Sequence, residues 1–213
     1  MQSQKIDLQD TKEFWNRDYV VCDDTTKLPE NYDVTKDGFV DIIHQWCIKY
    51  DVSQNARILE CGCGGGRILM LWNECSKRYG WHFVLEGIDH SSKAVAIAKE
   101  RLSTVKFSII GIEELSAKNK YDVIFTHTAL QHNSAWKQDL LLPELHKALK
   151  NTGLFWMINE KTFSTWEDGK IKNPFYCDDR GSAGTAAWWI QRIAEFGFEL
   201  LDYHKSSYTF QKI

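Results

Sequence analysis

An acid followed by three alternating glycines is the pattern in this sequence with the clearest chemical meaning. Glu60 closes an apolar run and is followed by Gly62, Gly64 and Gly66, after which Arg67 opens a segment with helical spacing. Glycine takes positive φ freely and lets a bound molecule approach the backbone. The unpaired N–H groups at the start of a helix favour a negative group. The pattern predicts a strand, a ligand-binding turn and a helix N-terminus, although a turn without a ligand would use the same glycines.

The spacing of the glycines excludes two phosphate-binding turns. A dinucleotide fingerprint has Gly-x-Gly-x-x-Gly, and here Arg67 stands where the third glycine should be. The Gly-x-x-x-x-Gly-Lys-Ser/Thr pattern of phosphate loops is also absent. What remains, acid-x-Gly-x-Gly-x-Gly from Glu60 to Gly66, resembles the first motif of the class I S-adenosylmethionine-dependent methyltransferases. The resemblance extends over about residues 55–213.

This resemblance implies S-adenosylmethionine as the cofactor. Its ammonium group would meet Glu60, its carboxylate would lie against Arg67 or the helix N-terminus, and Gly62 and Gly64 would let it approach the backbone.

Asp89, at the end of the second predicted strand, is the candidate ribose-binding residue. Its carboxylate would accept hydrogen bonds from two ribose hydroxyls, and His90 would lie beside the sugar or the adenine. Helix capping is the alternative, because Asp89 and the following Ser91 are both good capping residues.

Further cofactor contacts are predicted after the third and fourth strands. The resembled family often has Gly-Asp after the third strand, whereas this chain has Gly111 and Ile112. Adenine would then be recognised by Glu113 or by backbone groups, with Ile112 packed on the ring. By the same resemblance, Thr126 would offer its carbonyl group to the ammonium of the cofactor.

Two histidines near the end of the fourth strand are the first candidates for catalysis. His132 is the preferred general base, His127 the second choice, and Glu160, just beyond the fifth strand, the third. The resemblance implies that both histidines face the substrate, although His132 could also be a hydrogen-bonded structural histidine. In the resembled family, enzymes that methylate DNA have two prolines in this stretch, and metal-assisted enzymes that methylate catechols have acids. Both are absent here, which argues against these two types.

The elements that must position these residues alternate between strands and helices. Strands are predicted over 58–61, 81–88, 105–110, 121–126, 153–158, 198–204 and 207–213, and helices over 66–77, 91–102, 134–150 and 183–196. This alternation predicts an α/β fold: a Rossmann-like doubly wound sheet, mostly parallel with an antiparallel C-terminal strand and helices on both faces. Ligands of such sheets bind beyond the carboxyl ends of the strands, where the candidate residues fall.

Two segments lie outside this alternation. Residues 1–55 are predicted to form an N-terminal helical cap with an amphipathic helix over 35–49, ahead of a methyltransferase domain over 56–213. The stretch 14–19 would cover the cofactor or pack as an ordinary helix. An insert at about 162–181 has no clear periodicity, and we interpret it as a substrate lid, with an exposed loop as the alternative.

Composition narrows the range of partners. The chain has 213 residues and a formal net charge of −3, so one domain with a small-molecule substrate is expected and a nucleic acid is not. Six cysteines without ligand spacing predict neither a disulfide framework nor a metal site. No secretory signal and no run of about 18 apolar residues is found, which predicts a cytoplasmic protein without membrane contact. The oligomeric state is left undetermined.

These patterns predict a methyltransferase that transfers the methyl group of S-adenosylmethionine to an oxygen or nitrogen of a small molecule. Methylation of a protein N-terminal amine is a second hypothesis, because an acidic and aromatic lid would also hold a peptide amine. In a third hypothesis, from a different class, the domain binds the cofactor as a non-catalytic subunit. The acceptor itself is not predicted.

Overall fold

The computed structural model describes residues 28, 32–133, 135–158, 186–204 and 207–213. The chain divides into two compact units, Met1–Gly111 and Ile112–Ile213, and each is described by itself. The predicted covering stretch 14–19, the candidate base Glu160 and the predicted lid lie outside the described residues. Within the described ranges, no helix combines the length and the apolar character that crossing a membrane requires.

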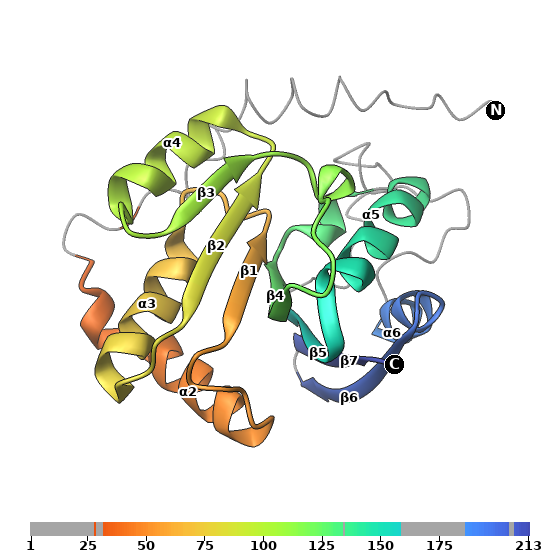
Figure 1. The fold of residues 1–213 in the computed structure, drawn as a ribbon, viewed down its shortest axis with the longest axis horizontal. Coiled ribbons are helices and arrows are strands. Elements are labelled where there is room, and N and C mark those ends of the chain that lie inside the picture. The colour runs from red at the N-terminus through yellow and green to blue at the C-terminus, as the bar shows by residue number, and fades with distance from the viewer. Residues whose placement is uncertain (1–27, 29–31, 134, 159–185, 205–206) are drawn as a thin grey trace, which may run out of the picture. The chain divides into compact units, whose positions relative to one another are not determined.

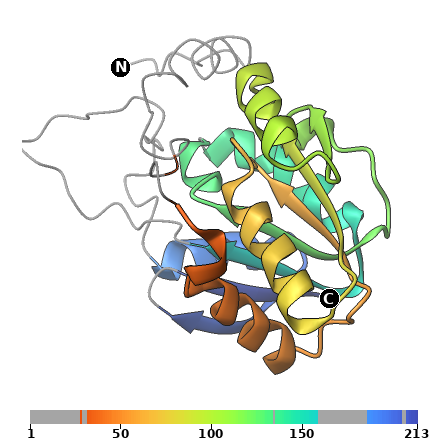
Figure 2. The ribbon, with the colours of Figure 1, turned by 90° about the vertical axis from the view of Figure 1, so that its left-hand side faces the viewer.

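The first unit contains three parallel strands and the helices that connect them (Figure 1). The strands are β1 (Arg57–Cys61), β2 (Val84–Asp89) and β3 (Lys106–Ile109), in the order β3-β2-β1. The helices are the short η1 (Val34–Lys36), α2 (Phe39–Lys49), α3 (Arg67–Tyr79) and α4 (Ser92–Arg101). Figure 2 views this unit from its helical side, with α2, α3 and α4 in front of the strands.

The register of the three strands brings their carboxyl ends to one edge. Cys61 pairs with Ile88, and Asp89 pairs with Ile109. The glycine turn leaves β1 at this edge, and Asp89 ends β2 there. The expectation that parallel strands bring these candidates to one edge is therefore confirmed for the first unit.

Local signals explain where the helices of the first unit begin and end. Ser91 accepts a hydrogen bond from the Ala94 amide at 3.3 Å and is the N-cap of α4. Asp37 accepts from the amide of Phe39 at 2.9 Å and so satisfies a free N–H at the start of α2. Beyond α3, Gly80 has a φ of 69°, the left-handed conformation that ends many helices.

Aromatic side chains fill the space between α2, α3 and the start of β2. Trp72 is fully buried, with ring centroids 6.3 Å from Trp46 and 5.4 Å from Phe83. Trp81 packs edge-on against Phe83, and its amide donates to the Ser76 carbonyl at 2.8 Å. The sequence placed the start of the second strand at Trp81, and this was wrong. The strand begins at Val84 because Trp81 and Phe83, which precede it, pack in the aromatic core instead of pairing with β1.

The second unit contains four strands in the order β4-β5-β7-β6. β4 (Tyr121–His127) and β5 (Leu149–Ile158) are parallel, whereas β7 (Ser207–Lys212) is antiparallel to both β5 and β6 (Phe198–His204). The helices are η2 (Ile112–Glu114), η3 (Leu130–His132), α5 (Ala135–Ala148) and α6 (Ala186–Ala194). The predicted antiparallel pairing of the last two strands is confirmed.

The fifth strand differs from its prediction at its beginning. β5 starts at Leu149, which pairs with Tyr121, and not at Gly153. Thr152 has a φ of 60°, and a Cβ on Gly153 would lie 2.9 Å from the Lys150 carbonyl oxygen. The strand therefore passes through an irregular stretch whose residues resemble a turn in the sequence.

Candidate cofactor-binding site

The glycine turn joins β1 to α3 through left-handed backbone conformations. Gly62, Gly64 and Gly66 have φ angles of 73°, 50° and 78°, a region that other residues occupy only at a cost. The amides of Gly62 and Cys63 both donate to the Ile88 carbonyl at 2.9 Å, which ties the turn to the end of β2. All three glycines of the motif are thus required by the backbone itself.

Two contacts with α4 fix the other side of the turn. A Cβ on Gly66 would lie 3.1 Å from the Cβ of Ala98, so this glycine also allows α3 to begin close to α4. Arg101 donates from Nη1 to the Gly65 carbonyl oxygen at 2.9 Å. Arg101 was not among the residues predicted from the sequence, because its position on a helix does not show which distant carbonyl it reaches.

Asp89 connects the glycine turn to the start of α4. Its Oδ2 accepts from the Gly64 amide at 2.9 Å, and its Oδ1 accepts from the Ser91 amide at 2.8 Å. The helix cap itself is Ser91. Each carboxylate oxygen has a further lone pair, so Asp89 retains the capacity to accept two hydroxyl donors. His90 follows in the same turn and is half-buried.

Glu60 is a buried carboxylate with an open hydrogen-bonding position. The residue is 2% exposed, and Oε2 has no hydrogen-bond partner among the described residues. Burial raises the pKa of this carboxyl well above its ordinary value, the charge of Asp89 raises it further, and a hydrogen bond from the Leu69 backbone opposes the shift. A buried carboxylate oxygen without a partner is costly, and a cationic group beside it would offset that cost.

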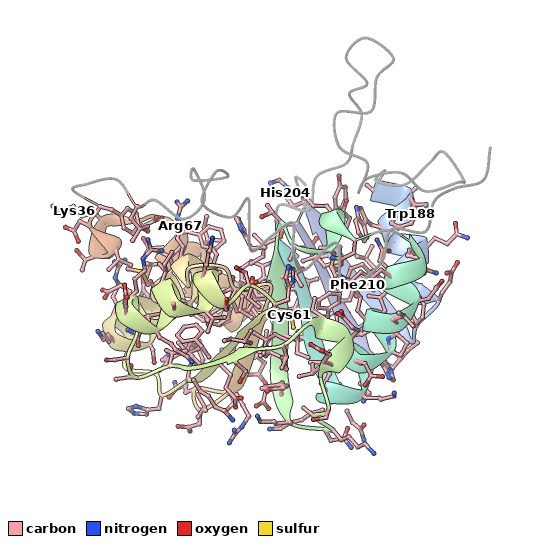
Figure 3. All side chains as sticks on the ribbon, turned by 90° about the horizontal axis from the view of Figure 1, so that it is seen from above. Lys36, Cys61, Arg67, Trp188, His204 and Phe210 are labelled. Carbon is pink, nitrogen blue, oxygen red and sulfur yellow. The ribbon has the colours of Figure 1, made fainter. Side chains whose placement is uncertain are left out.

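Arg67 occupies the rim of the turn as the first residue of α3, and Figure 3 shows it at the surface. A cation at a helix N-terminus opposes the helix dipole, and the first turn of α3 contains no acidic residue. The guanidinium carbon lies 5.8 Å from the centre of the Tyr32 ring. Within the described part of the chain, no carboxylate forms an ion pair with Arg67. An anion bound here would satisfy both the guanidinium and the helix end.

The two cysteines of the turn belong to the core. Cys61 and Cys63 are buried, and burial raises the pKa of both thiols; Figure 3 labels Cys61 in the interior. No three His, Cys, Asp or Glu side chains gather to form a possible metal site in the ranges that the structure describes.

The remaining candidates belong to the second unit or lie outside the described residues. Ile112 is buried at the start of η2, and Glu113 beside it is half-buried. Thr126 is fully buried near the end of β4, and its Oγ1 has no partner among the described residues. His127 ends β4 and is half-buried, whereas His132 ends η3 with a side chain outside the described part.

The connection after β4 has two features that were not predicted from the sequence. Thr128 has a φ of 54°, unusual for a β-branched residue, and its amide donates to the Ile158 carbonyl at 3.1 Å. Asn133 donates from Nδ2 to the Ala129 carbonyl at 2.9 Å, and Gln138 donates from Nε2 to the Asn133 carbonyl at 3.0 Å. These side chains hold the loop that carries both histidine candidates.

A comparison with protein families matches residues 52–188 to a methyltransferase domain, which is more than half of the chain. The chain belongs to the class I S-adenosylmethionine-dependent methyltransferases. The cofactor of this family is S-adenosylmethionine.

Two curated members of the family align with the chain. It is 32% identical over 107 residues to phosphoethanolamine N-methyltransferase of Plasmodium falciparum, covering 48% of this chain and 38% of that protein. It is 29% identical over 149 residues to malonyl-[acyl-carrier protein] O-methyltransferase of Priestia megaterium, covering 68% of this chain and 49% of that protein. The chain thus spans less than half the length of either relative in these alignments.

A solved structure shows the same fold. Magnesium protoporphyrin IX methyltransferase from Synechocystis, crystallised with S-adenosylhomocysteine, matches with a TM-score of 0.69 and 14% identity, over 97% of this chain and all of that one. This likeness confirms the predicted Rossmann-like, mostly parallel sheet with antiparallel strands at its C-terminal end.

The side chains of the first unit fit the methyltransferase cofactor chemically. Glu60 has an open carboxylate oxygen for an ammonium group, Asp89 has lone pairs for two hydroxyls, and Arg67 has a guanidinium for a carboxylate.

Proposed function

We propose that this chain transfers the methyl group of S-adenosylmethionine to an oxygen or nitrogen of a small molecule. The observation that carries the proposal is the buried Glu60 carboxylate with its open Oε2, next to a turn that is tied to Asp89. The bound cofactor supplies an electrophilic methyl group on a sulfonium ion. The chain has to hold both reactants in line, exclude water and, for some acceptors, remove a proton.

The first unit supplies the contacts to the aminoacyl and ribose parts in this proposal. Glu60 accepts hydrogen bonds from the ammonium, and Arg67 donates to the carboxylate together with the free N–H groups of α3. Asp89 accepts from the ribose hydroxyls through the lone pairs that its two backbone contacts leave open. Gly62 and Gly64 let the cofactor lie close to the backbone.

Adenine recognition is proposed residue by residue from the family resemblance. His90 lies beside the sugar or the base, Ile112 packs on the ring, and Glu113 accepts from the adenine amino group. The burial of Ile112 and the half-buried position of Glu113 support an apolar and a polar contact, respectively. Thr126 offers its backbone carbonyl to the ammonium group.

Proton removal depends on the acceptor. An oxygen nucleophile near neutral pH usually needs a base, and we assign this role to His132, then to His127, then to Glu160. The strained backbone of Thr128, next to His127, supports a functional role for this loop, because such strain is concentrated at functional sites. A neutral amine needs orientation more than a base.

The names of the two relatives support either nitrogen or oxygen as the atom that accepts the methyl group. One is named as a methyltransferase acting on the nitrogen of phosphoethanolamine, and the other as one acting on an oxygen of malonyl-[acyl-carrier protein]. The alternatives remain a protein N-terminal amine as acceptor, or a subunit that binds the cofactor without turnover.

The proposal is tested by incubating the purified chain with S-adenosylmethionine labelled in its methyl group, with and without a cell metabolite extract. We expect S-adenosylhomocysteine and a labelled small product only when the extract is present. Label in protein would favour the N-terminal amine alternative. Thermal stabilisation by added S-adenosylhomocysteine, without any release of S-adenosylhomocysteine from the cofactor, would favour the non-catalytic subunit. If neither the stabilisation nor the release is observed, the proposal is contradicted.

A further inference from the structure

Tyr32 lies over the guanidinium of Arg67, just outside the glycine turn. The guanidinium carbon is 5.8 Å from the ring centroid, within the range of a cation–π contact. Tyr32 belongs to the segment before η1, whereas Arg67 opens α3. The contact therefore connects the N-terminal part of the first unit with the rim of the cofactor site.

The Tyr32 ring is itself held in place. Its hydroxyl donates to Oδ2 of Asp37 at 2.6 Å, and Oδ1 of Asp37 accepts from the Phe39 amide at 2.9 Å. Partial burial and the hydrogen bond to Asp37 raise the pKa of Tyr32 to about 12, although hydrogen bonding to Arg67 and its positive charge lower it in part. The phenol therefore stays protonated and remains a donor. A chain of contacts thus runs from the start of α2 through Asp37 and Tyr32 to Arg67.

Arg67 needs such support because its own surroundings are unfavourable. It is a cation at the positive end of α3, and no acidic residue stands in the first turn of that helix. Without an aromatic surface, a long exposed side chain would sample many rotamers, and fixing it upon ligand binding would cost entropy. A preordered guanidinium loses less on forming its hydrogen bonds.

We propose that Tyr32 is a positioning residue, which holds Arg67 at the N-terminus of α3 in readiness for the carboxylate of the cofactor. The inference rests on the proposed function, in which Arg67 meets that carboxylate. It predicts that Tyr32 affects only the binding of ligands that carry the aminoacyl tail. A residue that merely supports the fold would affect all ligands alike.

The test uses two ligands that differ in that tail. S-adenosylhomocysteine carries the ammonium and the carboxylate, whereas methylthioadenosine has the same nucleoside without them. Isothermal titration calorimetry measures the dissociation constant of each ligand with the wild type, Tyr32→Ala, Tyr32→Phe, Arg67→Gln and the double variant Tyr32→Ala/Arg67→Gln.

The matched control is Tyr79→Phe. Tyr79 is the last residue of the same helix, and its hydroxyl also donates to a carboxylate, Asp41 Oδ1, at 2.7 Å. Its ring stacks on His44, away from the start of α3. The control removes a comparable hydrogen bond without touching Arg67, and we expect both dissociation constants to stay unchanged.

We expect Tyr32→Ala to raise the dissociation constant of S-adenosylhomocysteine about three- to fivefold, as loss of a cation–π contact predicts. The dissociation constant of methylthioadenosine should change less than about twofold. Tyr32→Phe keeps the ring but loses the hydrogen bond to Asp37, so we expect a smaller loss of affinity for S-adenosylhomocysteine. Once Arg67 is Gln, adding Tyr32→Ala should change neither constant by more than about twofold, because the two residues act through one contact.

Two results would overturn the role of Tyr32 while leaving the proposed function intact. One is an equal loss of affinity for both ligands, and the other is full additivity of Tyr32→Ala and Arg67→Gln. A wild type that binds neither ligand would instead refute the proposed function, and this inference with it. If Tyr32→Ala does not fold, Tyr32→Phe decides the question, and an unchanged ratio of its two dissociation constants contradicts the proposal.

Discussion

Replacing Asp89 by Ala should remove most of the affinity for the cofactor. In the proposed complex the carboxylate accepts two hydrogen bonds from ribose hydroxyls, and each bond to a charged group contributes about 1.5–3 kcal/mol. Water would compensate part of this loss, so we take about 3 kcal/mol as the net effect. That value corresponds to a loss of about 100-fold in affinity.

The same substitution also perturbs the empty protein. The amides of Gly64 and Ser91 lose their acceptor, at 2.9 and 2.8 Å in the native structure. Because Asp89 is only half-buried, water can reach these amides, and we expect the free energy of unfolding to fall by about 1–2 kcal/mol. The variant should therefore fold, and its binding can be measured directly.

The assay is calorimetric titration with S-adenosylhomocysteine and with an analogue whose ribose lacks its vicinal hydroxyls. The wild type should discriminate strongly between the two, whereas Asp89→Ala should bind them about equally. Asp122→Ala is the control, because Asp122 is a carboxylate paired with Lys150 at 2.7 Å on the surface of the second unit. An unchanged dissociation constant for S-adenosylhomocysteine in Asp89→Ala would refute the assignment of Asp89 as the ribose-binding residue.

Two further predictions concern Gly66 in the turn and Glu60 in the strand before it. Gly66→Ala places a side chain at a φ of 78° and 3.1 Å from Ala98, so urea unfolding should show a loss of about 1–3 kcal/mol, whereas Gly38→Ala, with open space around it, should cost nothing. Because burial raises the pKa of Glu60, the folded protein binds that proton more tightly than the unfolded chain. The stability of the cofactor-free protein should thus fall as pH rises above the ordinary value of 4.5 and level off above the folded pKa. Glu60→Gln should abolish this pH dependence in thermal melts and weaken the binding of S-adenosylhomocysteine. If the melting temperature of Glu60→Gln still falls with pH, Glu60 is not the group responsible.

The sequence was sufficient to predict the backbone of the site, because its signals are local. Gly62, Gly64 and Gly66 take the left-handed conformations that their spacing indicated, and the strand before them lies where the apolar run predicted. Parallel pairing then brings Asp89 to the same edge as the turn. These steps need only backbone geometry and the periodicity of the chain.

The residues that the sequence analysis missed act through contacts between distant segments. Arg101 reaches the carbonyl of Gly65, and Tyr32 covers Arg67, each across a gap of more than thirty positions in the chain. A long side chain on a helix or before it can reach many carbonyls or rings, and the packing of the unit selects one. The start of β2 was misplaced for the same reason, because Phe83 packs on Trp72 and Trp81 packs on Phe83 instead of extending the strand.

The most direct measurement is a crystal structure of the chain grown with S-adenosylhomocysteine at saturating concentration. The account predicts the amino nitrogen of the ligand within about 3 Å of a Glu60 carboxylate oxygen and both ribose hydroxyls at a similar distance from Asp89. Ligand density away from the glycine turn, with Glu60 Oε2 still without a partner, would contradict it.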